Sequence, residues 1–93
     1  MPEFEGFDWD RGNAEKNGLA HAVTPQEAEQ VFFNGPLMVG NDAKHSRTEK
    51  RYFALGQTDE DRLLFIAFTM RKRRLRVVSA RDMNRKERKV YLS

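Results

Sequence analysis

The sequence contains no cysteine, which excludes both a disulfide framework and a thiolate metal site. Its longest apolar run, LLFIAF, is far shorter than the roughly 20 residues that a membrane-spanning helix needs. The opening residues MPEFEGFDWD are acidic and lack the apolar segment of a secretory signal peptide. We therefore expect a soluble cytoplasmic protein that has no membrane partner.

Several catalytic motifs are also missing. The sequence has no glycine-rich phosphate loop, no nucleophile elbow and no carboxylate pair at a catalytic spacing. Its only histidines are His21 and His45, so we expect neither a metal nor a cofactor. His45 lies in the polar segment NDAKHSRTE, where Ser46, Arg47 and Glu49 would form either a small reactive loop or only a polar turn.

The chain has 93 residues and an uneven distribution of charge. The length fits a single domain, residues 1–93. From Arg71 to the end there are ten basic and two acidic residues, whereas residues 1–70 hold seven basic and twelve acidic ones. Such a basic tail indicates either a polyanionic partner, with nucleic acid the first candidate, or a solvated helix face. Charge alone does not choose between the two.

Two helices are predicted in the first third of the chain. Asp10 is a suitable N-cap for a helix that runs to about residue 21, with Asn13 three positions later. In TPQEAEQVFFNGP, Thr24 caps a second helix and Glu27 completes a capping box. The Asn-Gly-Pro sequence at residues 34–36 ends it.

Four strands are predicted next, in the segments LMVGND (37–42), RYFALGQ (51–57), LLFIAFTM (63–70) and LRVVSA (75–80). The continuous apolar character of the third predicts a central strand covered on both faces. The short connections favour an antiparallel meander. With a last helix in MNRKERKVYL packed on the sheet, the predicted fold is α+β: two N-terminal helices, a four-stranded antiparallel meander and a C-terminal helix.

The last helix contains a carboxylate in an unexpected place. A helical wheel puts Glu87 on the same side as Met83, Val90 and Tyr91, the stripe expected to face the sheet. A carboxylate there needs a paired cation, and we expect a cluster of Glu87 with one or more of Arg51, Arg76 and Arg81. Asp82 or Asn84 caps the helix; in the second case Glu87 belongs to a capping box instead and lies nearer solvent. Whether such a cluster only holds the helix or forms a reactive site stays open.

These segments together resemble the BrnT family of bacterial toxins. The resemblance lies in FDWD…N…H.V, EAEQVF, LMVGNDAKHS…E.R, ALG.T…RLLFIAFT and RVVSARDMNRKERKVY, and it extends from Phe7 to Tyr91. Its most specific part is the signature SAR…ER..Y. The matching positions are Trp9, Asp10, Asn17, His21, Glu49, Arg51, Arg76, Arg81, Glu87, Arg88 and Tyr91.

The resemblance implies a RelE-like fold and the toxin half of a type II toxin–antitoxin pair. It also implies a ribonuclease that blocks translation, with RNA, including ribosome-associated mRNA, as its target. A BrnA-type antitoxin would neutralise it in a toxin–antitoxin hetero-oligomer. The family often has lysine or glycine where this chain has Asn13, Ala20 and Ala22, on either side of His21.

RNA cleavage by the neighbouring 2′-hydroxyl needs no metal, only cations for the developing charge and groups that move protons. The candidates for catalysis are Arg51, Arg76, Arg81, Glu87, Tyr91 and His21. Phosphate contacts independent of sequence would come from Arg71, Lys72, Arg73, Arg74, Arg85, Lys86, Arg88 and Lys89. The alternatives are a non-catalytic module that binds RNA or the ribosome, and a protein whose basic surface only binds its antitoxin.

Overall fold

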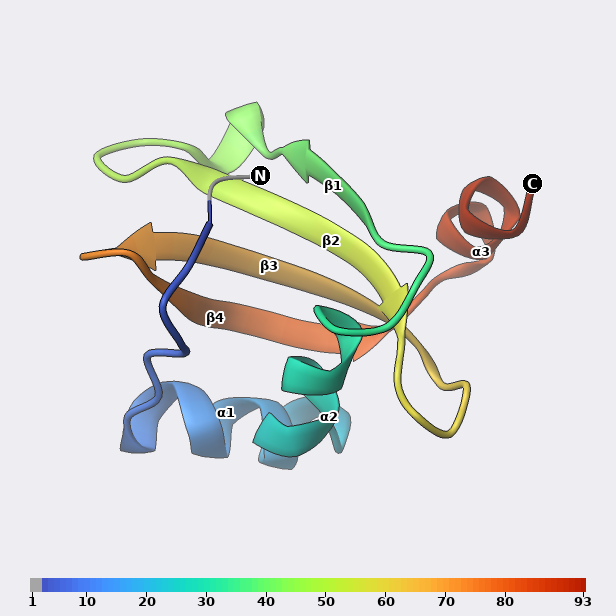
Figure 1. Ribbon diagram of the computed structural model, residues 1–93, viewed down its shortest axis with the longest axis horizontal. Helices are drawn as coiled ribbons and strands as arrows, with labels where there is room; N and C mark the ends of the chain where they lie inside the picture. Colours follow the sequence, from blue (N-terminus) through green and yellow to red (C-terminus); the bar gives the residue numbers. More distant parts are fainter. Residues whose placement is uncertain (1–2) are drawn as a thin grey trace.

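The computed structural model describes residues 3–93, except for the side chains of residues 16–20. The chain forms an α+β fold, as the sequence predicts (Figure 1). None of the helices within the described residues is long and apolar enough to cross a membrane. In chain order the elements are α1 (Arg11–His21), α2 (Pro25–Val31), β1 (Met38–Asn41), a 3-10 turn (Ala43–His45), β2 (Arg51–Gln57), β3 (Leu63–Arg71), β4 (Arg74–Asp82) and α3 (Arg85–Leu92).

The four strands form one antiparallel sheet in the order β1-β2-β3-β4, which confirms the predicted meander. Arg71 pairs with Arg74, so only Lys72 and Arg73 connect β3 to β4. Both residues have positive φ, 49° and 67°, as a two-residue hairpin turn with the twist of the flanking strands requires. The basic sequence RKRR is therefore a tight hairpin, and it extends β3 and β4 beyond their predicted ends.

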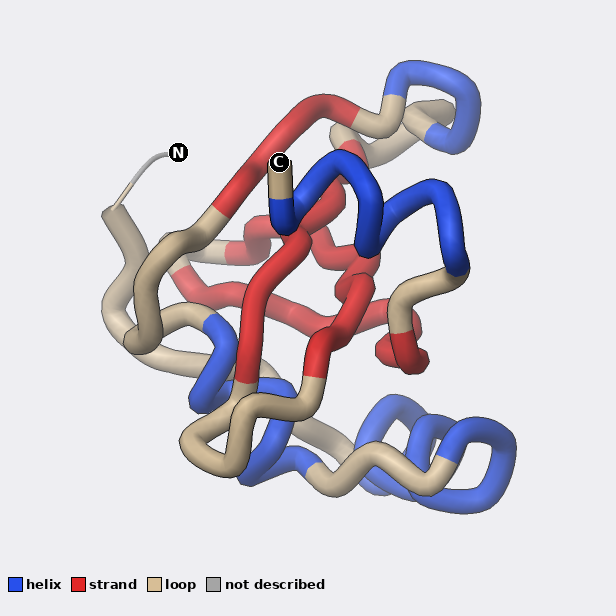
Figure 2. Tube along the Cα trace, turned by 90° about the vertical axis from the view of Figure 1, so that its right-hand side faces the viewer, coloured by secondary structure: helices blue, strands red, loops and turns tan. Residues whose placement is uncertain are grey.

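One face of the sheet carries the hydrophobic core. Helices α1 and α2 cover this face, and α3 lies on the opposite side, over one end of the sheet only (Figures 1 and 2). Leu64, Ile66, Phe68, Leu75 and Val77 alternate along β3 and β4 and are fully buried on the covered face. No helix runs the length of the other face, but Ala67 and Thr69 of β3 are also buried there, at 6% and 3% exposure, as expected for a central strand covered on both faces.

Each helix begins where the sequence predicts. At the start of α1, the Asp10 main chain donates to the Asn13 side chain at 2.7 Å, and the Asn13 main chain donates to the Asp10 carboxylate at 3.0 Å. Thr24 with Glu27 and Asn84 with Glu87 form complete capping boxes before α2 and α3. Asp82 is not a cap: it is the last residue of β4.

Asp82 instead belongs to a cluster around Arg62, which lies just before β3. The Arg62 guanidinium donates to both Asp82 carboxylate oxygens, at 2.8 and 3.2 Å, and to Glu27 at 3.1 Å. It also donates to the main-chain carbonyls of His21 and Ala22, at 3.3 and 2.9 Å. One side chain thus joins the end of α1, the start of α2 and the end of β4. These carboxylates, Asp82 first, raise the Arg62 pKa, and Arg62 lowers that of Asp82.

Helix α3 is attached to the sheet through Glu87, as predicted, but with fewer partners. Arg81 donates two hydrogen bonds to the Glu87 carboxylate, at 2.7 and 2.9 Å, and lies 4.2 Å from the centre of the Phe65 ring. The same carboxylate accepts from the Asn84 main chain at 2.9 Å, so the ion pair and the capping box exist together. Of the three candidate partners, Arg81 is the one that pairs with Glu87, because Arg51 and Arg76 lie towards the other end of the sheet.

The rest of the predicted helix stripe is only partly buried. Met83 and Tyr91 are 5% and 7% exposed, whereas Val90 is 48% exposed, contrary to the prediction. The Tyr91 hydroxyl donates to the Pro36 carbonyl at 2.6 Å, and burial raises the pKa of that phenol. The helix begins so close to the end of β4 that it covers only one end of the sheet, which leaves Val90 uncovered.

The substitution Arg62→Met should destabilise the protein by about 2 kcal/mol at pH 7, because hydrogen bonds to charged groups are lost. The pKa of Asp82 is lowered from 3.8, mainly by Arg62, and that of Glu27 from 4.5, by the Thr24 main chain and then Arg62. Their contribution is therefore complete above these values and is lost as the pH falls through the lowered ones. Urea unfolding at pH 7, 5 and 3 should show the difference from wild type shrinking only below pH 5. A difference that is constant with pH, or equal to that of exposed Arg85→Met, would contradict this role.

The substitution Glu87→Gln should cost about 1–2 kcal/mol of unfolding free energy. Glutamine preserves the capping-box acceptor but loses the two charged hydrogen bonds with Arg81. Urea denaturation measures the loss, with Glu60→Gln in the exposed β2–β3 turn as the control. A loss below about 0.5 kcal/mol, the usual range of surface substitutions, would show that the pair is effectively solvated.

Candidate nucleic-acid interface

Three polar side chains lie in a row across the open face of the sheet. Arg51 of β2 pairs with Thr69 of β3, and Thr69 pairs in turn with Arg76 of β4. Since directly paired residues point to the same face, all three side chains are on the face that α1 and α2 leave uncovered. The row lies at the end of the sheet remote from α3.

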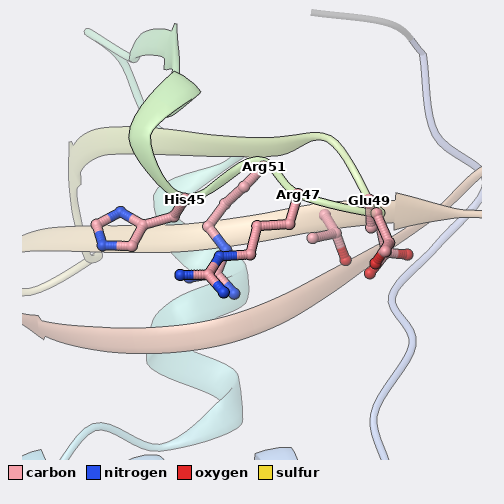
Figure 3. Close-up of a pocket in the computed structure, with 6 residues that line it drawn as sticks. His45, Arg47, Glu49 and Arg51 are labelled. Carbon is pink, nitrogen blue, oxygen red and sulfur yellow. The ribbon is translucent and has the colours of Figure 1, made fainter.

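Two adjoining cavities share this row. The first, of about 390 Å³, lies between the sheet and the loop that precedes β2 (Figure 3). The guanidinium groups of Arg47 and Arg51 point into the same part of it, with His45 to one side and Glu49 to the other (Figure 3). The second, of about 580 Å³, contains Arg51 and Glu49 as well, and extends to Arg76. The basic groups of the loop and of three strands thus line one continuous hollow.

Arg47 and Arg51 are the cations of this hollow that lack an acidic partner. Within the described part of the chain, neither forms an ion pair with a carboxylate. The Nε of Arg51 and the hydroxyl of Thr69 are buried and have no hydrogen-bond partner in the protein. Thr69 is only 3% exposed, and a buried polar group without a partner costs about 1–3 kcal/mol. A ligand that carries anionic oxygens would satisfy these donors.

Two further arginines of the hollow, Arg71 and Arg76, are paired with carboxylates. Arg71 donates to both oxygens of Glu49, at 2.8 and 3.2 Å, which lowers the pKa of Glu49. Arg76 donates to Asp10 at 2.7 Å, and its guanidinium lies 3.5 Å from Asp8. The Asn13 main chain first, and Arg76 second, lower the pKa of Asp10. Glu49 and Asp10 therefore stay ionised at neutral pH and fix Arg71 and Arg76 in place.

His45 is positioned by the loop that carries it. Its Nδ1 is 3.0 Å from both carboxylate oxygens of Asp42, which leaves Nε2 as the nitrogen free of this pair. The Ser46 hydroxyl donates to the Asp42 carbonyl at 2.8 Å and accepts from the Arg51 main chain at 2.9 Å. The loop is therefore tied to the start of β2. The loop lines the first cavity, and whether it is reactive or only a polar turn stays a prediction.

The structure separates the six residues that the sequence nominated for catalysis. Arg51 and Arg76 line the hollow together. Arg81 is five residues beyond Arg76 on β4, roughly 15 Å away at about 3.3 Å per residue, and is engaged by Glu87. The residues outside the hollow are Arg81, Glu87, Tyr91, which is bound to the Pro36 carbonyl, and His21, which is exposed at the end of α1.

The predicted phosphate-binding residues are all on the surface. Those of the β3–β4 hairpin and those of α3 are exposed, and the hairpin adjoins the hollow through Arg71. Asn17, which belongs to the sequence resemblance, and Ala20 have side chains outside the described residues. Asn13, where the family often has lysine, is buried and donates to the carbonyls of Asp8 and Val77 at 3.0 and 3.1 Å. The exposed set comprises Arg71, Lys72, Arg73, Arg74, Arg85, Lys86, Arg88 and Lys89.

Sequence reasoning missed Thr69, and it named Arg47 only as part of a loop that would be either reactive or a polar turn. A threonine near the end of a strongly apolar strand was the available signal for Thr69, because strand alternation places it on the same face as Phe65 and Ala67. Nothing in the sequence showed that the loop folds back over Arg51. No group of three or more His, Asp or Glu side chains that could hold a metal occurs among the described residues.

Comparison with known proteins and protein families places this geometry in a family. A search of curated proteins finds no similar sequence. The family model described as the ribonuclease toxin BrnT of type II toxin–antitoxin systems matches residues 9–87, most of the chain and all of the residues that line the hollow. The chain therefore belongs to the BrnT family of ribonuclease toxins.

Proposed function

We propose that this toxin is a metal-independent endoribonuclease that binds the scissile phosphate of RNA in the hollow on the open face. The observation that supports this most is the pair of guanidinium groups, Arg47 and Arg51, beside a buried hydroxyl without a partner at Thr69. A phosphate diester has the oxygens and the charge that these donors need. Arginine also matches the planar geometry of two phosphate oxygens.

In the proposed reaction the phosphorus is transferred from the 5′-oxygen to the 2′-oxygen of the same RNA strand, and the fragment that carries the 5′-oxygen is released. The RNA 2′-oxygen attacks the adjacent phosphorus and loses its proton to a base, and the bond from phosphorus to the 5′-oxygen breaks. The 5′-oxygen takes up a proton, so the products are a 2′,3′-cyclic phosphate and a 5′-hydroxyl. Extra negative charge forms on the equatorial oxygens in the transition state, and Arg47 and Arg51 stabilise it there.

His45 is the group in this hollow that we propose for proton transfer. Asp42 holds its Nδ1, so Nε2 is free to exchange a proton with the 2′- or the 5′-oxygen. Glu49 is a poor base, because Arg71 holds its pKa below the ordinary value. We assign Glu49 to fixing the orientation of Arg71.

The remaining nominated residues take other roles. We propose that Arg76 stays paired with Asp8 and Asp10 and holds the N-terminal segment against the sheet at the edge of the hollow. Arg81 and Glu87 brace α3, and Tyr91 anchors it to the segment before β1. The exposed basic side chains of the hairpin and of α3 bind the RNA backbone on either side of the cleaved bond.

Membership of a toxin–antitoxin family implies a protein antitoxin as partner. We propose that it is of the BrnA type, that it neutralises the toxin in a hetero-oligomer, and that cleavage of mRNA, on the ribosome or free, stops translation. Expression without the antitoxin tests the whole proposal. Growth arrest with fragmented RNA supports it, whereas arrest with intact RNA would favour a binding module that does not cleave.

The substitution Arg51→Gln should lower the rate of RNA cleavage at least 100-fold, the usual scale for removal of one donor to a developing oxyanion. The measurement is cleavage of a labelled oligoribonucleotide by the purified toxin. The matched control is Lys50→Gln, because Lys50 is adjacent and equally charged but lies over the Tyr52 ring, on the other face. An oligonucleotide with only 2′-deoxyriboses should stay intact. Full activity of Arg51→Gln would refute the site, and cleavage of the deoxy substrate would refute the mechanism.

The substitution His45→Gln should slow cleavage and flatten its dependence on pH between 5 and 8, where histidine side chains change charge. The chain has only one other histidine, so His21→Gln is the matched control, and it should keep the wild-type profile. The measurement is the single-turnover rate across this pH range. If His21→Gln flattened the profile and His45→Gln did not, the proton-transfer role would belong to the end of α1.

A further inference from the structure

A second surface, separate from the hollow, gathers the phenylalanines of the N-terminal segment. This segment runs along the outer edge of β4: the Glu5 main chain donates to Arg73 at 2.7 Å, and Leu75 donates to Gly6 at 2.9 Å. Phe7 forms an isolated parallel bridge with Leu75. The pairing brings Phe4 against Phe32 and Phe7 against Phe33, the residues that follow α2.

Three phenyl rings pack together there in tilted or edge-to-face pairs. The ring centres of Phe4 and Phe7 are 5.3 Å apart, and that of Phe33 lies 6.3 and 6.1 Å from them. Phe32 turns into the core at 8% exposure, whereas Phe33 is 72% exposed, the highest value among the large hydrophobic side chains that the structure describes. A phenylalanine held this far in solvent beside two others is typical of a surface that contacts another molecule.

The rings line a cavity of about 730 Å³ whose charged residues are all acidic. The carboxylates of Glu3, Glu5 and Glu29 surround it, and no basic side chain lines it. Glu29 accepts a hydrogen bond from the Trp9 indole at 2.7 Å, and Glu5 lies 3.4 Å from Arg73. We call Phe4, Phe7 and Phe33 with these three carboxylates the Phe–Glu surface. Its charge repels RNA, so it serves a different partner.

We infer that the Phe–Glu surface binds a segment of the antitoxin in which a lysine or arginine stands next to a large apolar residue. The faces of phenyl rings and the nearby carboxylates attract the same cation, and the rings also bury the apolar neighbour. This inference rests on membership of a toxin–antitoxin family and not on the cleavage site, because the antitoxin's binding site would lie outside the RNA-binding hollow.

A second copy of the chain fits this surface less well. Four of its exposed basic residues, Arg85, Lys86, Arg88 and Lys89, lie on α3, and docking that helix here would join two different patches of the protein. Such a head-to-tail contact does not close into a dimer and leads to rings or filaments. A partner of another sequence has no such constraint.

Trp9, the only tryptophan of the chain, reports on this surface because its indole is bonded to Glu29. Titration of the whole toxin with a short peptide of alternating lysine and leucine should change its fluorescence saturably. The same peptide with glutamate in place of lysine should not bind. Phe33→Ser should raise the Kd about tenfold, and Leu92→Ser, which removes a residue that is 68% exposed on α3, should leave it unchanged.

The antitoxin is then tested directly, using the protein encoded beside the toxin. Its affinity, measured by calorimetry, should also fall about tenfold for Phe33→Ser and not for Leu92→Ser. Unchanged affinity for Phe33→Ser, or equal binding of the glutamate peptide, would overturn the inference. So would a wild type that self-associates in sedimentation while Phe33→Ser stays monomeric, because a second copy would then be the occupant. None of these measurements requires RNA cleavage, so the two proposals fail separately.

Discussion

The short connection between β4 and α3 decides how much of the sheet stays open. Only Met83 and Asn84 separate the strand from the helix, and the bidentate pair of Arg81 and Glu87 fixes the helix where it begins. With so little chain available, α3 covers one end of the face, and no helix covers the other end, where Arg51, Thr69 and Arg76 lie. A longer connection would let the helix lie across the arginines.

Within that open face, the acidic residues organise the basic ones. Glu49 holds Arg71, and Asp8 and Asp10 hold Arg76. These ion pairs keep the two guanidinium groups from moving towards a bound phosphate or towards each other. Arg47 and Arg51 keep their full charge for a ligand. A net charge of +3 therefore describes the site poorly, because the useful positive charge is concentrated on a few groups that lack partners.

Local chemistry made much of the fold predictable. The capping boxes of Thr24 with Glu27 and of Asn84 with Glu87 depend on residues three apart, and strand alternation depends on neighbours two apart. Partners distant in sequence were not predictable. Arg76 meets Asp10 across 66 positions, because the N-terminal segment pairs with the edge of β4.

The same limit applies to the candidate site. Strand alternation and the family resemblance together pointed to Arg51 and Arg76, but Arg47 enters the hollow only because its loop folds back and is tied through Ser46. The wheel of the last helix correctly turned Glu87 towards the sheet. It failed for Val90, since a wheel shows which way a side chain points and not where the covering surface ends.

The ion pairs of the N-terminal segment also affect how RNA binding responds to salt. A basic residue contributes to the salt dependence when it displaces a counterion from the phosphate backbone. Arg76 and Arg73 already face Asp8, Asp10 and Glu5, so carboxylates of the same chain balance the charge of these two arginines, which add little to that displacement. The salt sensitivity of this toxin is thus set by fewer groups than its count of lysines and arginines, because part of its own chain already occupies the place of a nucleic acid.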